Sequence, residues 1–366
     1  MAGGKVEVWA PTQVPGIARA VAALAAGVHQ DAVTVHVTYL GGGFGRRLDA
    51  DFVGQAVRIA VETNGRPVQL LWSREEDMTH DFYRPAGVAV LRADLDAQGL
   101  PVALQITSAG DAITPRWMER GLPALAGPID APDKTVSEGL FDLPYGVPNQ
   151  RMAHVATHSL VPVGFWRSVG HSHNAFFSEC FIDELAFEAK QDPVAFRLAL
   201  LKEAPRYAAV LKLAADKAGW GTPLPAGRAR GVALHESFGS IVAQVVEVSL
   251  EGGKPRVHRV VCAADVGTVV NPAIVAQQME GAVIFGLTAA LFGRIDIEGS
   301  VVAQRNFPDY PLVGMAGAPR IETHLVASTR SPSGVGEPGT PPIAPALANA
   351  LFVLTGKRLR ELPLTL

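Results

Sequence analysis

Cysteine is scarce in this sequence. The 366 residues contain two cysteines, Cys180 and Cys262. Two thiols cannot build a disulfide framework, a four-cysteine zinc site or an iron–sulfur cluster within the chain. Any redox chemistry would therefore need a bound cofactor or a partner.

Charged residues are also few, at 18% of the chain, and the two signs nearly cancel. The 32 Lys and Arg against 35 Asp and Glu give a net charge of -3. Nucleic-acid binding needs an excess of Lys and Arg, so we expect no nucleic-acid partner. A hydrophobic content of 48% is enough for a sizeable core and too high for a disordered chain. The length allows one large domain or two.

Long hydrophobic runs are missing. A membrane-spanning helix needs about 20 consecutive apolar residues. The longest apolar stretch, 284–292, follows Gln277, Gln278 and Glu280, and it predicts a buried helix instead. The N-terminus has no charged segment followed by an apolar one, so no signal peptide is predicted. We therefore expect a soluble globular protein without a membrane span.

The order of strand and helix signals predicts a mixed α/β (α+β) fold. In the first half, strands are expected at 5–10, 33–40, 68–72, 88–95 and 102–109, and helices at 17–26, 52–61, 174–190 and 194–201. The last two of these strands should form a hairpin that turns at 97–99. In the second half, strands are expected at 231–235, 241–249, 257–264 and 322–328, and helices at 273–291 and 344–354. The Gly- and Pro-rich stretch 219–227 predicts a boundary between domains 1–218 and 219–366.

A glycine-rich loop, Gly41-Gly42-Gly43-Phe44-Gly45, follows one of the expected strands. Glycines let the backbone come close to a ligand, so the amides of this loop could hold an anionic or oxo group. A tight strand-to-helix turn explains the same residues equally well. The loop lacks the Gly-Lys-Ser/Thr ending of a nucleotide-binding P-loop.

A second unusual loop, 161–174, contains Arg167 directly after Phe165 and Trp166. The planar guanidinium could bind a phosphate or oxo group, and an ion pair is the alternative. His171 and His173 suggest metal ligands, but their spacing is weak for a metal site. Hydrogen-bonded structural histidines are favoured.

Two further segments carry polar residues in special places. Asn271-Pro272 precedes an expected helix in which Gln278 is one of few polar residues, and a structural role is favoured there. Glu337 lies between Gly336 and Pro338, whose restricted backbone would hold a carboxylate in place for proton transfer. The same segment formally matches the G-x-G-x-x-G dinucleotide fingerprint. Its prolines remove amide donors and too few residues follow for a nucleotide-binding half, so that interpretation is rejected.

In this order, the segments resemble the molybdenum-binding large subunit of the xanthine dehydrogenase/aldehyde oxidase family, most closely its isoquinoline 1-oxidoreductase branch. The resemblance covers the chain from about residue 6 to the C-terminus. It implies that both domains are of the molybdopterin-binding type, the first of them partial. It also implies cofactor-binding roles for Gln13, Gly42, Gly43, Phe44, Gly45, Arg167, Asn271, Gln278 and Gly336.

The resemblance further implies the chemistry. Glu337 would be the catalytic base in a hydroxylation that takes its oxygen from water, with an N-heteroaromatic (isoquinoline-like) or aldehyde substrate. The cofactor would be molybdopterin cytosine dinucleotide. Its pterin dithiolene holds the molybdenum, so the chain itself supplies no metal ligand. Electrons would leave to [2Fe-2S] clusters on a small iron–sulfur partner subunit, in agreement with the two cysteines.

The sequence also departs from the family pattern. Arg46-Arg47 end the glycine loop where most relatives have Gly-Lys or similar, and the Met-Gly-Gln-Gly cofactor loop is absent. The chain therefore looks like the C-terminal half of a longer subunit, and the missing N-terminal portion is an expected partner. The alternative function is a non-catalytic half-subunit or scaffold. Relatives suggest the periplasm, although a cytoplasmic location is also consistent.

Overall fold

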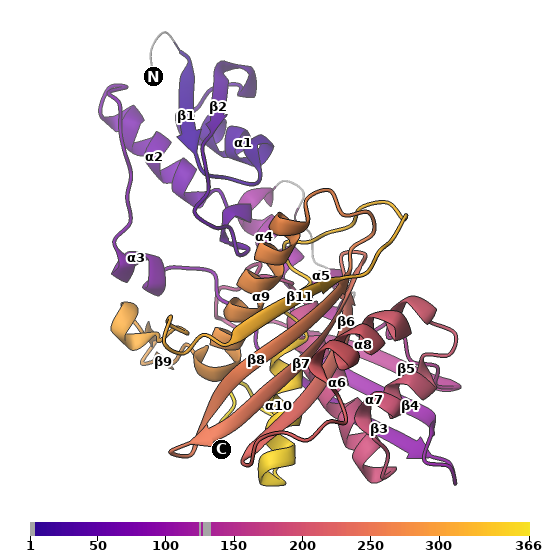
Figure 1. Cartoon of the computed structure of the whole chain (residues 1–366). Helices are drawn as coiled ribbons and strands as arrows, with labels where there is room; N and C mark the ends of the chain where they lie inside the picture. The colour runs from indigo at the N-terminus through magenta and orange to yellow at the C-terminus, as the bar shows by residue number, and fades with distance from the viewer. Residues whose placement is uncertain (1–3, 124–125, 127–132) are drawn as a thin grey trace.

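A computed structural model describes residues 4–123, 126 and 133–366 (Figure 1). Its first part is a small lobe, residues 6–62, in which β1 (Val6–Ala10) pairs in parallel with β2 (Val33–Val37). Helices α1 (Pro15–Ala26) and α2 (Asp51–Glu62) pack on this pair and on each other. The predicted strands and helices of this lobe are confirmed, although β2 ends three residues earlier than expected.

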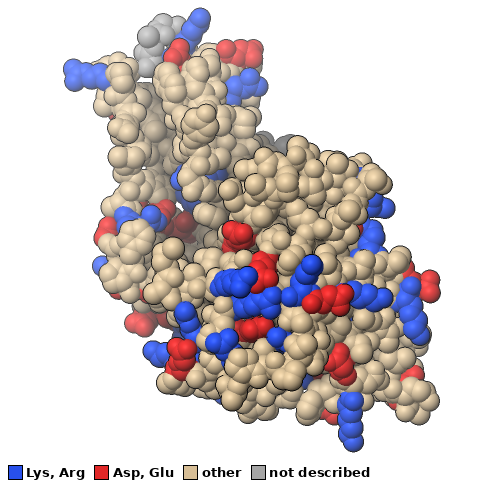
Figure 2. Space-filling model, viewed as in Figure 1, with Lys and Arg blue, Asp and Glu red and all other residues tan. Residues whose placement is uncertain are grey.

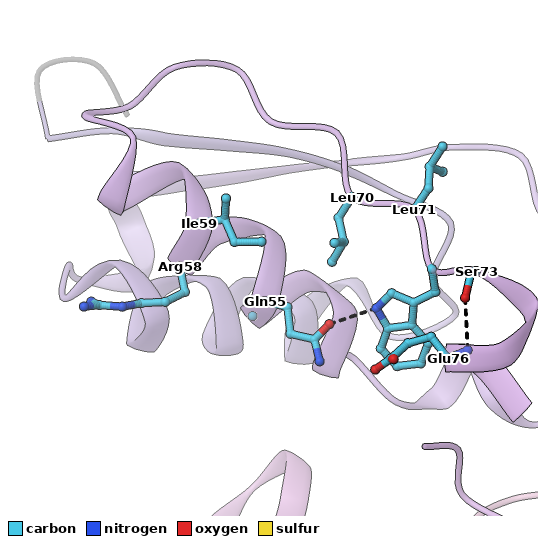
Figure 3. A pocket seen from close by; sticks show the side chains of 9 residues that line it. Gln55, Arg58, Ile59, Leu70, Leu71, Ser73 and Glu76 are labelled. Carbon is cyan, nitrogen blue, oxygen red and sulfur yellow. Dashed lines mark hydrogen bonds between the residues drawn. The ribbon is translucent and has the colours of Figure 1, made fainter. Parts of the chain in front are cut away.

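The prediction of a strand at 68–72 is wrong. These residues pair with no strand in the described part of the chain and run beside α2, where Trp72 Nε1 donates to Gln55 Oε1 at 2.9 Å. An apolar pattern cannot make a strand without a neighbour that satisfies its backbone groups. A hollow of about 800 Å³ lies between α2 and this segment, with Ile59 and Leu70 on its sides (Figure 3). None of the predicted site residues lines it.

A three-stranded sheet follows in the order β3-β4-β5. The predicted hairpin is confirmed: β3 (Gly87–Leu95) and β4 (Pro101–Asp111) are antiparallel. The third strand, β5 (Asn149–Thr157), pairs in parallel with β4 and was not expected from the sequence. Short elements lie around these sheets: α3 (Arg74–Thr79), α4 (Thr114–Gly121), α5 (Lys134–Ser137), β9 (Ile297–Glu298) and β10 (Val301–Val302).

The largest sheet has the order β11-β8-β7-β6. Its antiparallel strands are β6 (Arg228–Ser237), β7 (Ser240–Glu251) and β8 (Lys254–Asp265), and β11 (Arg320–Leu325) joins β8 in parallel. Nine successive residues of β7, Ser240–Val248, are buried. Strands covered on both faces have such continuous apolar runs, which is why these strands were predictable.

Helices cover both faces of this sheet (Figure 1). One face packs against α7 (Pro193–Leu200) and α8 (Pro205–Ala218), and the other against α9 (Pro272–Phe292) and α10 (Ile343–Thr355). Helix α6 (His171–Glu188) contributes residues to both cores. The predicted domain boundary lies in the loop between α8 and β6, and residues on both sides of it share one core. Among the described residues, α9 is the helix long and apolar enough to cross a membrane, and 44% of its apolar window is buried.

A buried ion pair fixes α6 to its neighbours. Arg197 of α7 is fully buried and donates from Nε to Glu179 Oε2 at 3.0 Å. The same carboxylate accepts from the hydroxyl of Tyr145 at 2.5 Å and from the amide of Leu234 at 2.9 Å. The charges are therefore removed from water but well satisfied.

On the face shown in Figure 2, charges of both signs are interspersed rather than gathered by sign. On the sheet, Arg259 pairs with Glu322 at 2.8 Å and with Glu247 at 3.3 Å, and Arg230 also reaches Glu247, at 3.1 Å. These ion pairs link β6, β7, β8 and β11.

Candidate active site

The glycine loop leaves the end of β2 in a backbone form that most side chains disfavour. Gly42 and Gly45 have φ angles of 137° and 105°, and Phe44 itself is at 50°. A Cβ on Gly45 would lie 2.0 Å from the carbonyl oxygen of Phe165. Only glycine therefore lets this loop contact the loop 161–174, which contains Arg167 and which we call the arginine loop. The close approach explains the glycine and joins two of the predicted segments.

Gln13 lies against the same loop. A Cβ on Gly43 would be 2.8 Å from Gln13 Oε1, and the backbone amide of Gln13 donates to the carbonyl of Arg47 at 3.1 Å. The Gln13 side chain is exposed, and no hydrogen bond holds its amide among the described residues. Its amide group is therefore free to bind a ligand beside Gly43.

An aromatic layer connects the lobe to α9. The ring of Phe44 stacks on that of Phe285 with centroids 4.9 Å apart. The Trp166 ring also packs against Phe285, with centroids 4.7 Å apart. Arg167 lies over both phenylalanines, 5.9 Å from the Phe44 centroid and 5.6 Å from that of Phe285. Phe44 is still 49% exposed, so part of its ring faces the open side of the loop.

The lobe is also attached to the main body directly beside this layer. Trp117 Nε1 donates to the carbonyl of Leu48 at 2.8 Å, and Arg120 pairs with Asp49 at 3.1 Å. We call the contacts of residues 44–49 with α4, the arginine loop and Phe285 the lobe junction. The candidate site thus borders the junction between two parts of the fold.

Arg167 is buried and joins the arginine loop to the Glu337 loop. Its Nε donates to the carbonyl of Gly336 at 2.8 Å, and Nη2 donates to the same oxygen and to Gln278 O at 3.4 Å. Burial lowers its pKa, and the nearby Glu337 charge opposes that effect. No ion pair involves Arg167 among the described residues, so its guanidinium positions carbonyl groups around the site.

Glu337 is held beside the start of α6. Ser168 donates from Oγ to the Glu337 carbonyl at 2.7 Å, and its amide lies 3.5 Å from Glu337 Oε1. Ser168 and Val169 have φ angles of 71° and 47°, which are strained for residues other than glycine. Burial raises the pKa of Glu337, and this effect exceeds the opposing ones from the Ser168 amide and Arg167. A carboxylate with a raised pKa is a better proton acceptor.

Gln278 and Asn271, the two polar residues predicted near α9, have different surroundings. Gln278 Oε1 lies 3.5 Å from Arg167 Nη2, so it belongs to the same cluster. Asn271 caps α9, where its Oδ1 accepts from the amides of Ala273 at 3.1 Å and Ile274 at 3.2 Å. Capping explains an asparagine at this position. No contact joins Asn271 to Arg167 or Glu337 among the described residues, and its cofactor role stays a prediction.

The two histidines make hydrogen bonds within the protein. His171 Nδ1 lies 3.0 Å from His235 Nε2, and His173 Nε2 lies 3.0 Å from the carbonyl of Val136. Burial lowers the pKa of His171 to about 4 and that of His173 to about 3, so both rings are neutral. No group of three His, Cys, Asp or Glu residues in the described ranges is placed to hold a metal ion.

Three residues near the site were not singled out from the sequence. Phe285 stacks on Phe44, the charge of Glu337 contributes to the raised pKa of Glu138, and the Arg84 guanidinium lies 4.2 Å from the centroid of the Trp166 ring. Each comes from an ordinary helix or loop without a motif, so only the tertiary structure brings it to the site.

Comparison with known proteins agrees with the sequence resemblance. Two molybdopterin cofactor-binding domains match, over residues 1–201 and 200–319. The chain is 36% identical to isoquinoline 1-oxidoreductase subunit beta of Brevundimonas diminuta, over 99% of this chain and 46% of that protein. It is 31% identical to membrane-bound aldehyde dehydrogenase [pyrroloquinoline-quinone] of Gluconacetobacter polyoxogenes, over 92% of this chain and 46% of that protein.

The fold is similar to that of solved molybdenum hydroxylases. Quinoline 2-oxidoreductase from Pseudomonas putida 86 superimposes with a TM-score of 0.79 over 97% of this chain and 71% of that chain, at 13% identity. The mixed α/β fold with packed helices, as predicted, is confirmed. The chain spans about half the length of the two curated relatives.

Proposed function

Because this chain belongs to the family of molybdopterin cofactor-binding domains, we propose that it forms the cofactor-binding and catalytic part of an oxidoreductase. The reaction would be hydroxylation of an N-heteroaromatic or aldehyde substrate with water as the oxygen source. The observation that carries the proposal is the convergence of the glycine loop, Arg167 and Glu337, which come from distant parts of the sequence.

The residues of the site fit such a cofactor. The glycines of the loop offer backbone without Cβ atoms, and Gln13 presents an exposed amide beside Gly43. Gln278 is also exposed and lies at Arg167. No cluster of metal-binding side chains is needed, since a dithiolene cofactor carries its own metal ligands. The cofactor would be bordered by Gly42, Gly43, Phe44, Gly45, Arg167 and Gly336. Asn271 would bind it from the start of α9. The cofactor supplies the redox centre when bound, in its cytosine dinucleotide form by analogy with the family.

The protein's part in the reaction is to position groups and to move a proton. Glu337, with its raised pKa, would accept a proton at its carboxylate from the water that becomes the product oxygen. Arg167 would keep the Glu337 loop in place through the Gly336 carbonyl. The aromatic layer of Phe44, Phe285 and Trp166 would exclude water from one side.

The proposal includes partners. We propose a small subunit with [2Fe-2S] clusters as electron acceptor, together with the remaining portion of the large subunit. The rival function is a non-catalytic scaffold that needs that portion for any cofactor binding.

Elemental analysis of the complete complex tests this function. We expect about one molybdenum per chain when the complex is purified from a host that makes the cofactor, together with turnover of isoquinoline or of an aldehyde. A complex that folds without molybdenum would support the scaffold. A molybdenum-free complex would also agree with a quinone-dependent dehydrogenase, the kind of enzyme that the name of the second relative gives.

A further inference from the structure

Arg46, the residue directly after the glycine loop, is held by carboxylates from two other segments. Its Nη1 and Nη2 donate to the two carboxylate oxygens of Asp51, each at 2.9 Å, and its Nε lies 2.6 Å from Asp81 Oδ1. Asp51 begins α2, and Asp81 lies in the loop between α3 and β3. Only 18% of the Arg46 side chain is exposed, so water and salt screen these ion pairs less than pairs on the surface.

Three aromatic rings surround the same guanidinium. Its carbon lies 5.2 Å from the ring centroid of Phe82, 5.3 Å from that of Trp72 and 6.0 Å from that of Phe52. A planar guanidinium can pack on aromatic rings and bind a carboxylate with two hydrogen bonds at the same time. A lysine ammonium is a compact point charge and cannot do both. These surroundings are therefore specific for arginine.

Residues 81–83 extend this contact to the arginine loop. Tyr83 N donates to the carbonyl of Pro162 at 2.8 Å, and Gly164 N donates to the carbonyl of Tyr83 at 3.0 Å. The guanidinium of Arg46 therefore connects the glycine loop to the arginine loop at a second place, in addition to the close approach of the two backbones described above.

The glycine loop needs support from outside because part of its backbone is strained. Phe44 has a φ angle of 50°, and a residue other than glycine keeps a positive φ only where the surrounding structure enforces it. Within the loop, Arg46 N donates to the carbonyl of Gly43 at 2.9 Å. This bond closes a local turn but does not fix the turn to the rest of the fold. The side chain of Arg46 does so through its ion pairs.

We propose that Arg46 is a positioning residue that holds the glycine loop in the shape that binds the cofactor. The inference rests on the proposed function and adds the residue that keeps Phe44 and Gly45 in place beside the cofactor. Arg46 acts through the loop, since its own guanidinium is occupied by Asp51, Asp81 and the aromatic rings. It is also a position at which the sequence departs from the family pattern. Without the guanidinium, the loop would lose its connection to α2 and to the arginine loop.

The test measures the opening of the loop and the retention of molybdenum separately, in the complete complex purified from a host that makes the cofactor. Hydrogen exchange reports on the amides of Leu48 and Asp49, which donate to the carbonyls of Gly45 and Arg46 at 3.1 and 3.2 Å. Arg46→Met should speed exchange of these two amides by at least about 10-fold, because local opening then costs less free energy. Exchange of the amides of β7 should be unchanged.

Molybdenum retention is the second measurement. Arg46→Met should speed the loss of molybdenum during dialysis by about 10- to 100-fold, the range typical of residues that orient the groups around a metal. Arg46→Lys keeps the charge but should restore only a small part of the retention, because lysine cannot replace the planar group.

Arg259→Met is the matched control. Arg259 is also paired with two carboxylates, those of Glu247 and Glu322, and 24% of its side chain is exposed, but it lies on the large sheet. This variant should lower the melting temperature while leaving loop exchange and molybdenum retention as in the wild type. If Arg46→Met does not assemble, Asp81→Asn removes one ion pair only and should give smaller changes of the same sign.

The outcomes are distinguishable. Unchanged exchange of the loop amides in Arg46→Met would overturn the inference, and so would faster exchange with molybdenum retained as in the wild type. Equal loss of molybdenum from Arg259→Met would also overturn it, because the effect would then reflect general stability. A wild-type complex that folds without molybdenum contradicts the proposed function itself, and the inference about Arg46 falls with it.

Discussion

Arg167 Nε lies 2.8 Å from the carbonyl oxygen of Gly336, although 169 positions separate the two residues. This hydrogen bond fixes the residue directly before Glu337 to the arginine loop. The buried guanidinium therefore controls the position of Glu337, the proposed base, without sharing an ion pair with it. The arrangement also explains why an arginine is needed, since its Nε and Nη2 both reach the same carbonyl.

Glu337→Gln should lower turnover of the complete complex by about 10²- to 10⁴-fold, because the amide cannot accept a proton. Molybdenum content and melting temperature should stay unchanged, since size and most hydrogen bonding are kept. In the wild type, kcat/KM for an aldehyde should rise as the pH passes the raised pKa of Glu337, because the base must be ionised. Near-normal turnover of the variant, with full molybdenum content, would contradict this role.

Gly45→Ala should disrupt the contact between the glycine loop and the arginine loop. The new Cβ would lie 2.0 Å from the Phe165 oxygen, at a φ angle of 105° that alanine disfavours. We expect a loss of at least about 1–3 kcal/mol in unfolding free energy, together with lower molybdenum occupancy. Gly41→Ala is the control, because its Cβ would meet no atom within 4 Å. Equal stability of the two variants in thermal unfolding would show that the contact is unimportant.

Arg197→Met should destabilise the fold without changing the chemistry of the site. Removing the buried guanidinium leaves the Glu179 carboxylate in the core without its charge partner. The expected cost in unfolding free energy is about 3–5 kcal/mol, measured by chemical denaturation. Arg294→Met, which breaks an exposed pair with Asp296, should have little effect. A small change for Arg197→Met would mean that water reaches Glu179.

Stability should fall in mild acid because His171 is buried in its neutral form. Its pKa of about 4 in the folded state lies below the ordinary value of 6.5, so only the unfolded chain takes up a proton between these pH values. Above pH 6.5 both states are neutral and nothing is lost. As the pH falls from 6.5 toward 4, this histidine alone should remove about 1.4 kcal/mol per pH unit. Denaturation of the wild type and His171→Gln at pH 7 and pH 5 should show a shallower loss for the variant.

The sequence was informative where one physical cause dominates a segment. The buried runs of β7 and β8 and the turn between β3 and β4 could be predicted because burial and turn chemistry are local signals. The apolar segment 68–72 failed because pairing depends on a neighbour that the pattern cannot reveal. Strand β5 was missed since it is mostly exposed.

The same distinction holds for the site. The glycine, arginine and Glu337 loops have unusual compositions, and the structure brings them together as the resemblance implied. Phe285 lies in a segment of ordinary composition, so its stacking on Phe44 follows only from the tertiary structure. Asn271 shows the reverse case, because a conspicuous residue has a complete local explanation as a helix cap.

The lobe junction has a thermodynamic consequence. The lobe of residues 6–62 and the main body meet through Phe44 on Phe285, Gly45 on Phe165 and Asp49 on Arg120. A group bound beside the glycine loop and Arg167 would touch both parts at once. Docking of the lobe and occupancy of the site would then be reciprocally coupled, each favouring the other by the same free energy.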